Sequence, residues 1–251
     1  MTPWEAIAIF VAGVGAGGVN VVVGSGSLIT FPTMVAAGMP PIIANVSNNI
    51  GLVPGSLTGA LGYRAELTGQ RERLIRLGAG SIVGSLIGAV LLLLLPPGTF
   101  TVVVPVLIGL ACVLVVVQPS LNRWLSARGE ERRPHGGPWL WIGVFAAGIY
   151  GGYFGAAQGV LLIGLLGSFL DDDLQRVNAA KNVLSLLVNA TAAVLFVLVA
   201  QVDWRAVALV AVGASIGGFL GARVGRRLPA PVLRGVVVCI GGVAMVKLLY
   251  G

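Results

Sequence analysis

Two short polar segments lie within apolar runs of the sequence, and their side chains are suited to binding a small anion. Residues 45–49 read Asn-Val-Ser-Asn-Asn, and residues 178–182 read Asn-Ala-Ala-Lys-Asn. The amide and hydroxyl groups donate hydrogen bonds, and Lys181 adds a positive charge with no carboxylate beside it. An ionisable residue inside an apolar segment usually serves function. The alternative is a lysine whose flexible stem carries its ammonium to the polar boundary of the apolar region.

Two glycine-rich segments are the second candidate for binding. Residues 24–27 read Gly-Ser-Gly-Ser and residues 155–159 read Gly-Ala-Ala-Gln-Gly, each near the middle of a long apolar run. A helix that restarts after such a break presents free N–H groups and the positive end of its dipole, which attract anions. The alternative is that these glycines only permit a kink and close packing. The predicted substrate-binding residues from all four segments are Gly24, Ser25, Gly26, Ser27, Ser47, Asn48, Asn49, Gln158, Lys181 and Asn182.

No catalytic or metal-binding site is predicted. The only histidine, His135, lies in a polar stretch, and Cys112 and Cys239 lie in apolar runs without metal-ligand spacing. The HExxH and P-loop patterns are missing. No acidic residue lies well inside an apolar run, which argues against a carrier of metal cations. We therefore expect neither an enzyme nor a nucleotide-driven pump, and no cofactor.

The composition indicates a membrane protein. Of 251 residues, 57% are hydrophobic and 10% are charged, whereas about a quarter of the residues of a soluble domain are charged. The net charge of +7 falls mostly between the apolar runs. We interpret it as a signal for membrane topology and expect no nucleic-acid partner.

The apolar runs predict the helices. A crossing needs about 20 apolar residues, and the runs that qualify are residues 4–37, 41–62, 74–95, 100–117, 139–170, 177–200, 206–224 and 232–250. The first run of each half is much longer than one crossing requires and contains one of the glycine-rich segments. We predict an all-α membrane protein in which each half consists of a broken helical hairpin and three transmembrane helices.

The two halves are related by a constant offset, 213 − 80 = 133. The pairs at this offset are Gly80 and Gly213, Gly84 and Gly217, Gly88 and Gly221, Asn45 and Asn178, Asn49 and Asn182, Thr58 and Thr191, and Pro96 and Pro229. Several matches that are not glycine indicate a duplication. The glycine triplets, spaced four residues apart, favour helix packing over ligand binding.

The basic residues predict how the halves are oriented. They favour short cytoplasmic loops, and they follow the second run of the first half but the third run of the second half. Equivalent loops therefore carry opposite signals, which predicts two inverted repeats. The predicted division is residues 1–118, a cytoplasmic linker over 119–138, and residues 139–251. Both termini are predicted to lie outside the cytoplasm.

The sequence resembles the sulfite exporter TauE/SafE family. The likeness rests on the glycine-rich stretch 13–18, on residues 24–32 and 44–49, and on residues 148–159 and 178–182 in the second half. It covers essentially the whole chain. The resemblance implies a transporter of sulfite, sulfonates, related sulfur anions or small organic acids in the bacterial inner membrane.

The predicted function is secondary transport of a small anion, most consistent with sulfite or an organosulfonate, by alternating access. Inverted repeats with broken helices commonly hold the substrate between the repeats near the membrane midplane. A proton or sodium gradient or the membrane potential would supply the energy, and no oligomeric state is predicted. The alternatives are an anion channel, a transporter of a small carboxylate, an intramembrane enzyme and a membrane-anchored scaffold.

Overall fold

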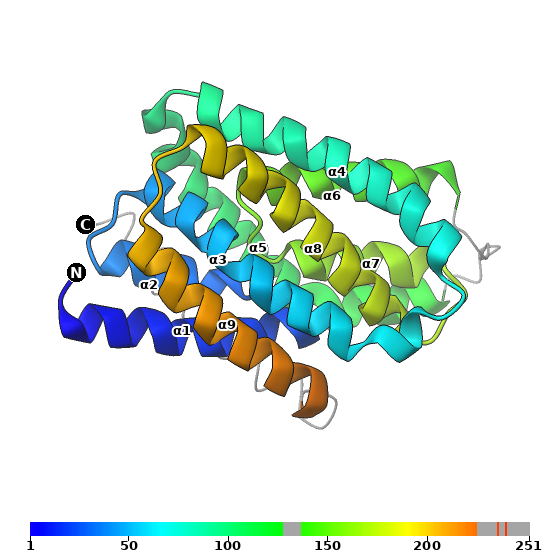
Figure 1. The fold of residues 1–251 in the computed structure, drawn as a ribbon. Coiled ribbons are helices and arrows are strands. Elements are labelled where there is room, and N and C mark those ends of the chain that lie inside the picture. The colour runs from blue at the N-terminus through cyan, green and yellow to red at the C-terminus, as the bar shows by residue number, and fades with distance from the viewer. Residues whose placement is uncertain (128–136, 225–234, 236–238, 240–251) are drawn as a thin grey trace.

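The computed structural model describes residues 1–127, 137–224, 235 and 239 (Figure 1). All regular elements in these ranges are helices, which confirms the all-α prediction. They are α1 (Pro3–Val22), α2 (Ser27–Ala36), α3 (Pro41–Gly62), the short η1 (Arg64–Leu67), α4 (Arg71–Leu94), α5 (Pro97–Ala127), α6 (Pro138–Tyr153), α7 (Gln158–Phe169), α8 (Leu174–Val199) and α9 (Trp204–Val224). Apart from residues 235 and 239, the predicted run 232–250 lies outside the described residues.

Both long apolar runs are interrupted where the sequence predicts. The interruption between α1 and α2 contains Gly24 at φ 87°, and the one between α6 and α7 contains Gly155 at φ 76°. Such left-handed backbone ends a helix, and glycine adopts it without strain. Ala157 follows with φ 57° and is the only described residue other than glycine with a positive φ. Each hairpin is therefore a helix, a break and a second helix.

Five helices of the described chain are long and apolar enough to cross a membrane. They are α1, α4, α8, and the segments Gly98–Val117 of α5 and Trp204–Arg223 of α9. The helix α3 is as long as α1, but its polar segment at residues 45–49 lowers its hydropathy. Those polar side chains are buried against protein, so α3 does not require a continuous apolar surface.

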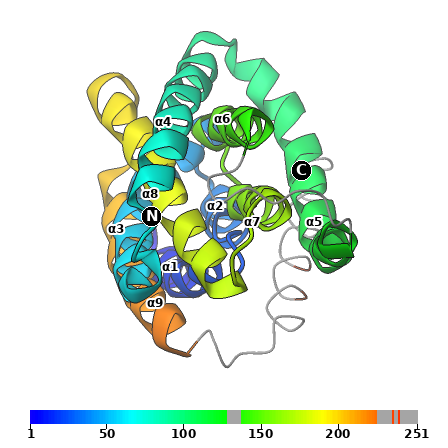
Figure 2. The same ribbon diagram turned by 90° about the vertical axis from the view of Figure 1, so that its right-hand side faces the viewer.

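The helices of one half pack against those of the other. α1 packs closely against α9, and α4 packs closely against α6; Figure 2, which looks along the helices, shows both pairs. Glycines make these contacts possible: a methyl group on Gly84 would lie 2.3 Å from the Phe145 carbonyl oxygen, and one on Gly217 would lie 1.9 Å from that of Val14. The prediction that the glycine triplets serve packing is confirmed for this structure.

One end of the bundle is held by an ionic cluster. Asp172, in the segment between α7 and α8, accepts hydrogen bonds from Arg73 of α4 and from Arg176 of α8, the latter at 2.7 Å. The Gln70 side chain accepts from Arg73 at 2.9 Å and donates to the Arg176 carbonyl at 3.1 Å. The cluster therefore ties the start of α4, in the first half, to the start of α8, in the second.

The cluster should make stability depend on pH. Burial alone would raise the pKa of Asp172, but the hydrogen bonds and charges of Arg73 and Arg176 hold this pKa below its ordinary value. The ionised carboxylate therefore stabilises the fold above its unfolded pKa, and this contribution is lost as the pH falls through the folded pKa. The unfolding temperature of the wild-type protein should fall more steeply on acidification than the unfolding temperature of Asp172→Asn. Parallel declines would show that the cluster contributes no pH-dependent stability.

Candidate functional site

The two breaks meet inside the protein. The Gly159 amide, at the start of α7, donates a 3.0 Å hydrogen bond to the Gly24 carbonyl. A methyl group on Gly24 would lie only 2.4 Å from the Cα of Gly159. The backbone of one half thus touches the backbone of the other at the two interrupted helices. Gly24 is required by its φ and by this close approach, irrespective of any ligand.

Lys181 lies between the breaks and reaches the end of α1. Its Nζ donates to the carbonyls of Asn20 at 2.9 Å and Val21 at 3.0 Å. The side chain of Lys181 is fully buried, so it does not extend to the polar boundary of the apolar region. A cation at the carboxyl end of a helix is stabilised by the helix dipole and satisfies carbonyls that have no helical partner. This position also leaves one ammonium proton for another acceptor.

Asparagines complete the ends of both broken helices across the two halves. Asn178 and Asn182 of α8 donate to the Val21 carbonyl of α1, at 3.2 and 3.4 Å. In the other half, Asn45 of α3 donates to the Tyr153 carbonyl of α6 at 3.0 Å. Asn45 and Asn178 are the pair related by the offset of 133 residues. Each half therefore caps the broken helix of the other.

Several hydrogen-bond donors at the breaks are unused. Within the described chain, the amides of Ser25, Gly26 and Ser27 before α2, and of Ala156 and Ala157 before α7, make no hydrogen bond. The Ser25 hydroxyl and the Gln158 amide nitrogen are also buried without a partner there. Unpaired buried donors cost free energy unless a ligand or water satisfies them. Both breaks thus contain hydrogen-bond donors that have no partner in the described chain.

The remaining predicted residues separate into two groups. Asn48 donates to the Ser27 hydroxyl at 3.2 Å and accepts from the Thr30 hydroxyl, so it joins α3 to the start of α2. Ser47 instead accepts a 3.0 Å hydrogen bond from the Asp203 amide at the start of α9. Its hydroxyl therefore stabilises a helix connection, and the structure does not bring it to the breaks.

A buried polar network beside the breaks includes residues that the sequence analysis did not select. Ser56 of α3 accepts from Asn20 of α1 at 3.4 Å and from Asn189 of α8 at 3.3 Å. Asn49 donates to Asn189 at 3.5 Å, and the nearby α8 hydroxyl of Ser185 is buried without a described partner. Ser56 and Asn189 are related by the same offset, 189 − 56 = 133. This offset between two different polar residues was the sequence signal that could have identified Ser56 and Asn189.

The fold, with five described helices long and apolar enough to cross a membrane, is that of a multi-pass membrane protein. The chain belongs to the family described as sulfite exporter TauE/SafE, whose family model matches residues 9–248. The family and the names of the relatives below indicate a membrane transporter.

Curated relatives match nearly the whole chain. A probable membrane transporter protein, YfcA, of Escherichia coli (strain K12) is 28% identical over 240 residues, which cover 94% of this chain and 86% of that protein. A probable membrane transporter protein of Haemophilus influenzae is 24% identical over 245 residues, covering 96% of this chain and 93% of the relative. No solved structure matches the chain.

Proposed function

We propose that this protein is a secondary transporter of a small anion, either sulfite or an organosulfonate or related sulfur oxyanion. The observation that carries the proposal is the contact of two buried helix breaks, with unused donors from both half-helices and a fully buried lysine between them. In the described ranges, every acidic residue lies at a helix end or in a connecting segment. An anion would therefore meet donors and a cation without a competing carboxylate.

The proposed binding site comprises the two breaks and the side chains that face them. Ser25, Gly26, Ser27 and Gln158 would contribute hydrogen-bond donors, and Lys181 would contribute charge. Asn48, Asn49 and Asn182 would hold the surrounding side chains in place through their hydrogen bonds. The family name supports a sulfur oxyanion, and a small carboxylate offers similar acceptor oxygens and is the second candidate.

We further propose inverted repeats over residues 1–118 and 139–251, joined by a cytoplasmic linker, in the bacterial inner membrane. The chain directions in Figure 1 support this: α1, α3 and α9 start on the left, whereas α4, α6 and α8 start on the right. By the offset, α1 corresponds to α6, α3 to α8 and α4 to α9, so corresponding helices run in opposite directions. Most described arginines lie at the right-hand helix ends, which favours the cytoplasm on that side.

Alternating access is supported by a difference between the two ends. Asp172 and Arg176 correspond, at the offset of 133, to Met39 and Ile43 at the opposite end. There, Met39 and Ile43 line a cavity of about 530 Å³ beside the start of α9. Ion pairs thus tie the two halves at Asp172 and Arg176, whereas the equivalent residues Met39 and Ile43 carry no charge. Such an asymmetry is expected of a transporter that is closed toward one side of the membrane.

The inverted arrangement predicts opposite labelling of two equivalent positions. Thr68 and Gln201 are both exposed, lie just before α4 and α9, and differ by 133 residues. In right-side-out vesicles, a cysteine at Gln201 should react with an impermeant thiol reagent, and one at Thr68 should be protected until the membrane is opened. Equal reactivity of the two cysteines would contradict the inverted repeats.

Ligand-induced stabilisation tests the substrate class. The unfolding temperature of the purified protein would be measured with sulfite, sulfate, thiosulfate, sulfoacetate or small carboxylates. All anions would be added as salts of the same cation. A ligand that binds only the folded state stabilises it by about 2.7 kcal/mol at 100 times its dissociation constant. We expect sulfite or a sulfonate to raise the unfolding temperature in a saturable manner. Stabilisation by none of these anions would contradict the proposed site.

A further inference from the structure

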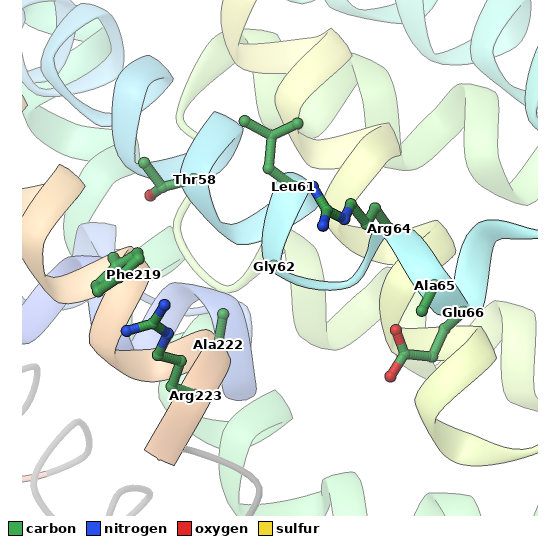
Figure 3. Close-up of a pocket in the computed structure, with 9 residues that line it drawn as sticks. All are labelled: Thr58, Leu61, Gly62, Arg64, Ala65, Glu66, Phe219, Ala222 and Arg223. Carbon is green, nitrogen blue, oxygen red and sulfur yellow. The ribbon is translucent and has the colours of Figure 1, made fainter.

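A second pocket is lined by none of the residues proposed for the transport site. It is a cavity of about 500 Å³ between the ends of α3 and α9 and the η1 segment that follows α3. Figure 3 shows Arg64 and Arg223 on its two sides. Leu61 lies beside Arg64, and Phe219 lies beside Arg223. It lies at the end of the bundle where Arg73 and Arg176 are also found, which the proposed topology places in the cytoplasm.

The pocket has basic groups suited to a phosphodiester. The guanidinium carbon of Arg223 lies 4.0 Å from the centre of the Phe219 ring, a cation–π contact that holds the charge at the pocket wall. Neither Arg64 nor Arg223 pairs with a carboxylate in the part of the chain that the structure describes. Glu66 also lines the pocket, at the side away from Arg223 (Figure 3), and it has an interaction of its own. The two guanidinium groups therefore remain available to bind phosphate oxygens.

The apolar side chains distinguish a lipid from a soluble anion. Leu61 is 58% exposed and Phe219 is 47% exposed, and the surface continues along the same helices through Leu57 and Leu220. A free phosphate or sulfate gains nothing from these side chains. A phospholipid places its phosphodiester at the arginines and its acyl chains along the apolar surface. Basic pockets between transmembrane helices at the cytoplasmic side are typical sites for anionic headgroups.

The pocket does not lead to the helix breaks. Its inner side is closed by the packing of α3 on α9 and α1: a methyl group on Gly62 would lie 2.3 Å from the Ala222 side chain, and one on Gly59 would lie 2.4 Å from that of Val21. In this structure the pocket is therefore separated from the helix breaks by packed helices.

We propose that this pocket binds the headgroup of an anionic phospholipid, with Arg64 and Arg223 at the phosphodiester. The inference is independent of which anion is transported. It makes the junction of α3 and α9, which come from different halves, sensitive to the charge of the surrounding membrane.

The test compares lipids and variants on the purified full chain by native mass spectrometry and thermal unfolding. The probes are phosphatidylglycerol, phosphatidylcholine of the same acyl chains, and inorganic phosphate. Arg64→Gln with Arg223→Gln removes both charges, and Arg205→Gln, an exposed arginine at the opposite end, is the matched control. If the double variant cannot be purified, Arg64→Gln and Arg223→Gln are each compared with the wild-type protein instead.

We expect phosphatidylglycerol to bind and to raise the unfolding temperature of the wild-type protein and of Arg205→Gln. Its affinity should fall by roughly tenfold or more in the double variant and by less in each single variant. Equal effects of phosphatidylglycerol and phosphatidylcholine would overturn the proposal, as would unchanged affinity in the arginine variants. Binding of inorganic phosphate as strong as that of the lipid would assign the pocket to a soluble anion instead.

Discussion

Replacing Lys181 with Met should weaken anion binding by roughly one to two orders of magnitude, because one charge-assisted hydrogen bond contributes about 1.5–3 kcal/mol. Methionine retains most of the length and the apolar stem of lysine but has no charge. Lys181 also donates to the carbonyls of Asn20 and Val21, so the variant loses part of the cap on α1. Removing a buried charge offsets some of that loss, and we expect the protein to insert normally. Anion titrations followed by thermal unfolding would measure the affinity.

Asn178→Ala is the matched control for this substitution. Asn178 donates to the same Val21 carbonyl from one turn earlier on α8, so its loss weakens the cap without removing a charge. If Lys181 attracts the anion, Asn178→Ala should lower stability while affinity stays near that of the wild-type protein. Equal losses of affinity in both variants would mean that the cap on α1, and not the charge, controls binding. Unchanged affinity in Lys181→Met would exclude Lys181 from the site.

Gly217→Ala should destabilise the protein more than any other alanine substitution in the glycine triplets. The new methyl group would lie 1.9 Å from the Val14 carbonyl oxygen and 2.8 Å from the Val14 carbonyl carbon, so α1 and α9 must separate. Overpacking of this kind costs about 1–3 kcal/mol, or more, and exceeds the gain of up to about 1 kcal/mol that alanine gives a helix over glycine. The unfolding temperature should fall by several degrees, and the yield of monodisperse protein should fall with it.

Gly167→Ala should not share the destabilising effect of Gly217→Ala and serves as its control. Gly167 lies in α7, and an added methyl group would have no heavy atom of another residue within 4 Å, apart from its neighbours and its own helix. Stability should therefore stay equal or rise slightly. If the unfolding temperature of Gly217→Ala were as high as that of Gly167→Ala, α1 and α9 could not pack as closely as described.

Much of the fold could be predicted because a membrane imposes length and hydropathy on each helix. The broken hairpins were also predictable, since Gly24 and Gly155 supply the left-handed backbone that ends α1 and α6. The purpose of Gly24 was less accessible. The sequence analysis selected Gly24 for anion binding, but an alanine Cβ there would meet the Gly159 backbone, so Gly24→Ala should disturb the fold before it affects binding.

The side-chain partners could not be predicted from local sequence. Lys181, Asn178 and Asn182 were recognised as polar residues inside an apolar run, but their acceptors are about 160 residues away on α1. Ser47 has the same composition-based signal as Asn48, yet it bonds Asp203 and not a break. Such differences depend on helix rotation and on contacts between halves, which hydropathy alone does not specify.

Counterflow in proteoliposomes is the most direct test of anion transport. Vesicles containing the purified protein would be loaded with unlabelled sulfite, and the uptake of radiolabelled sulfite would be followed with sulfonates and carboxylates as competitors. If the protein is a secondary transporter of sulfite, uptake should saturate and should be accelerated by sulfite inside the vesicle. Lys181→Met should reduce this uptake at low sulfite concentration. Uptake that does not saturate and is accompanied by large unitary currents would identify a channel. The absence of uptake and of competition by any of these anions would contradict anion transport.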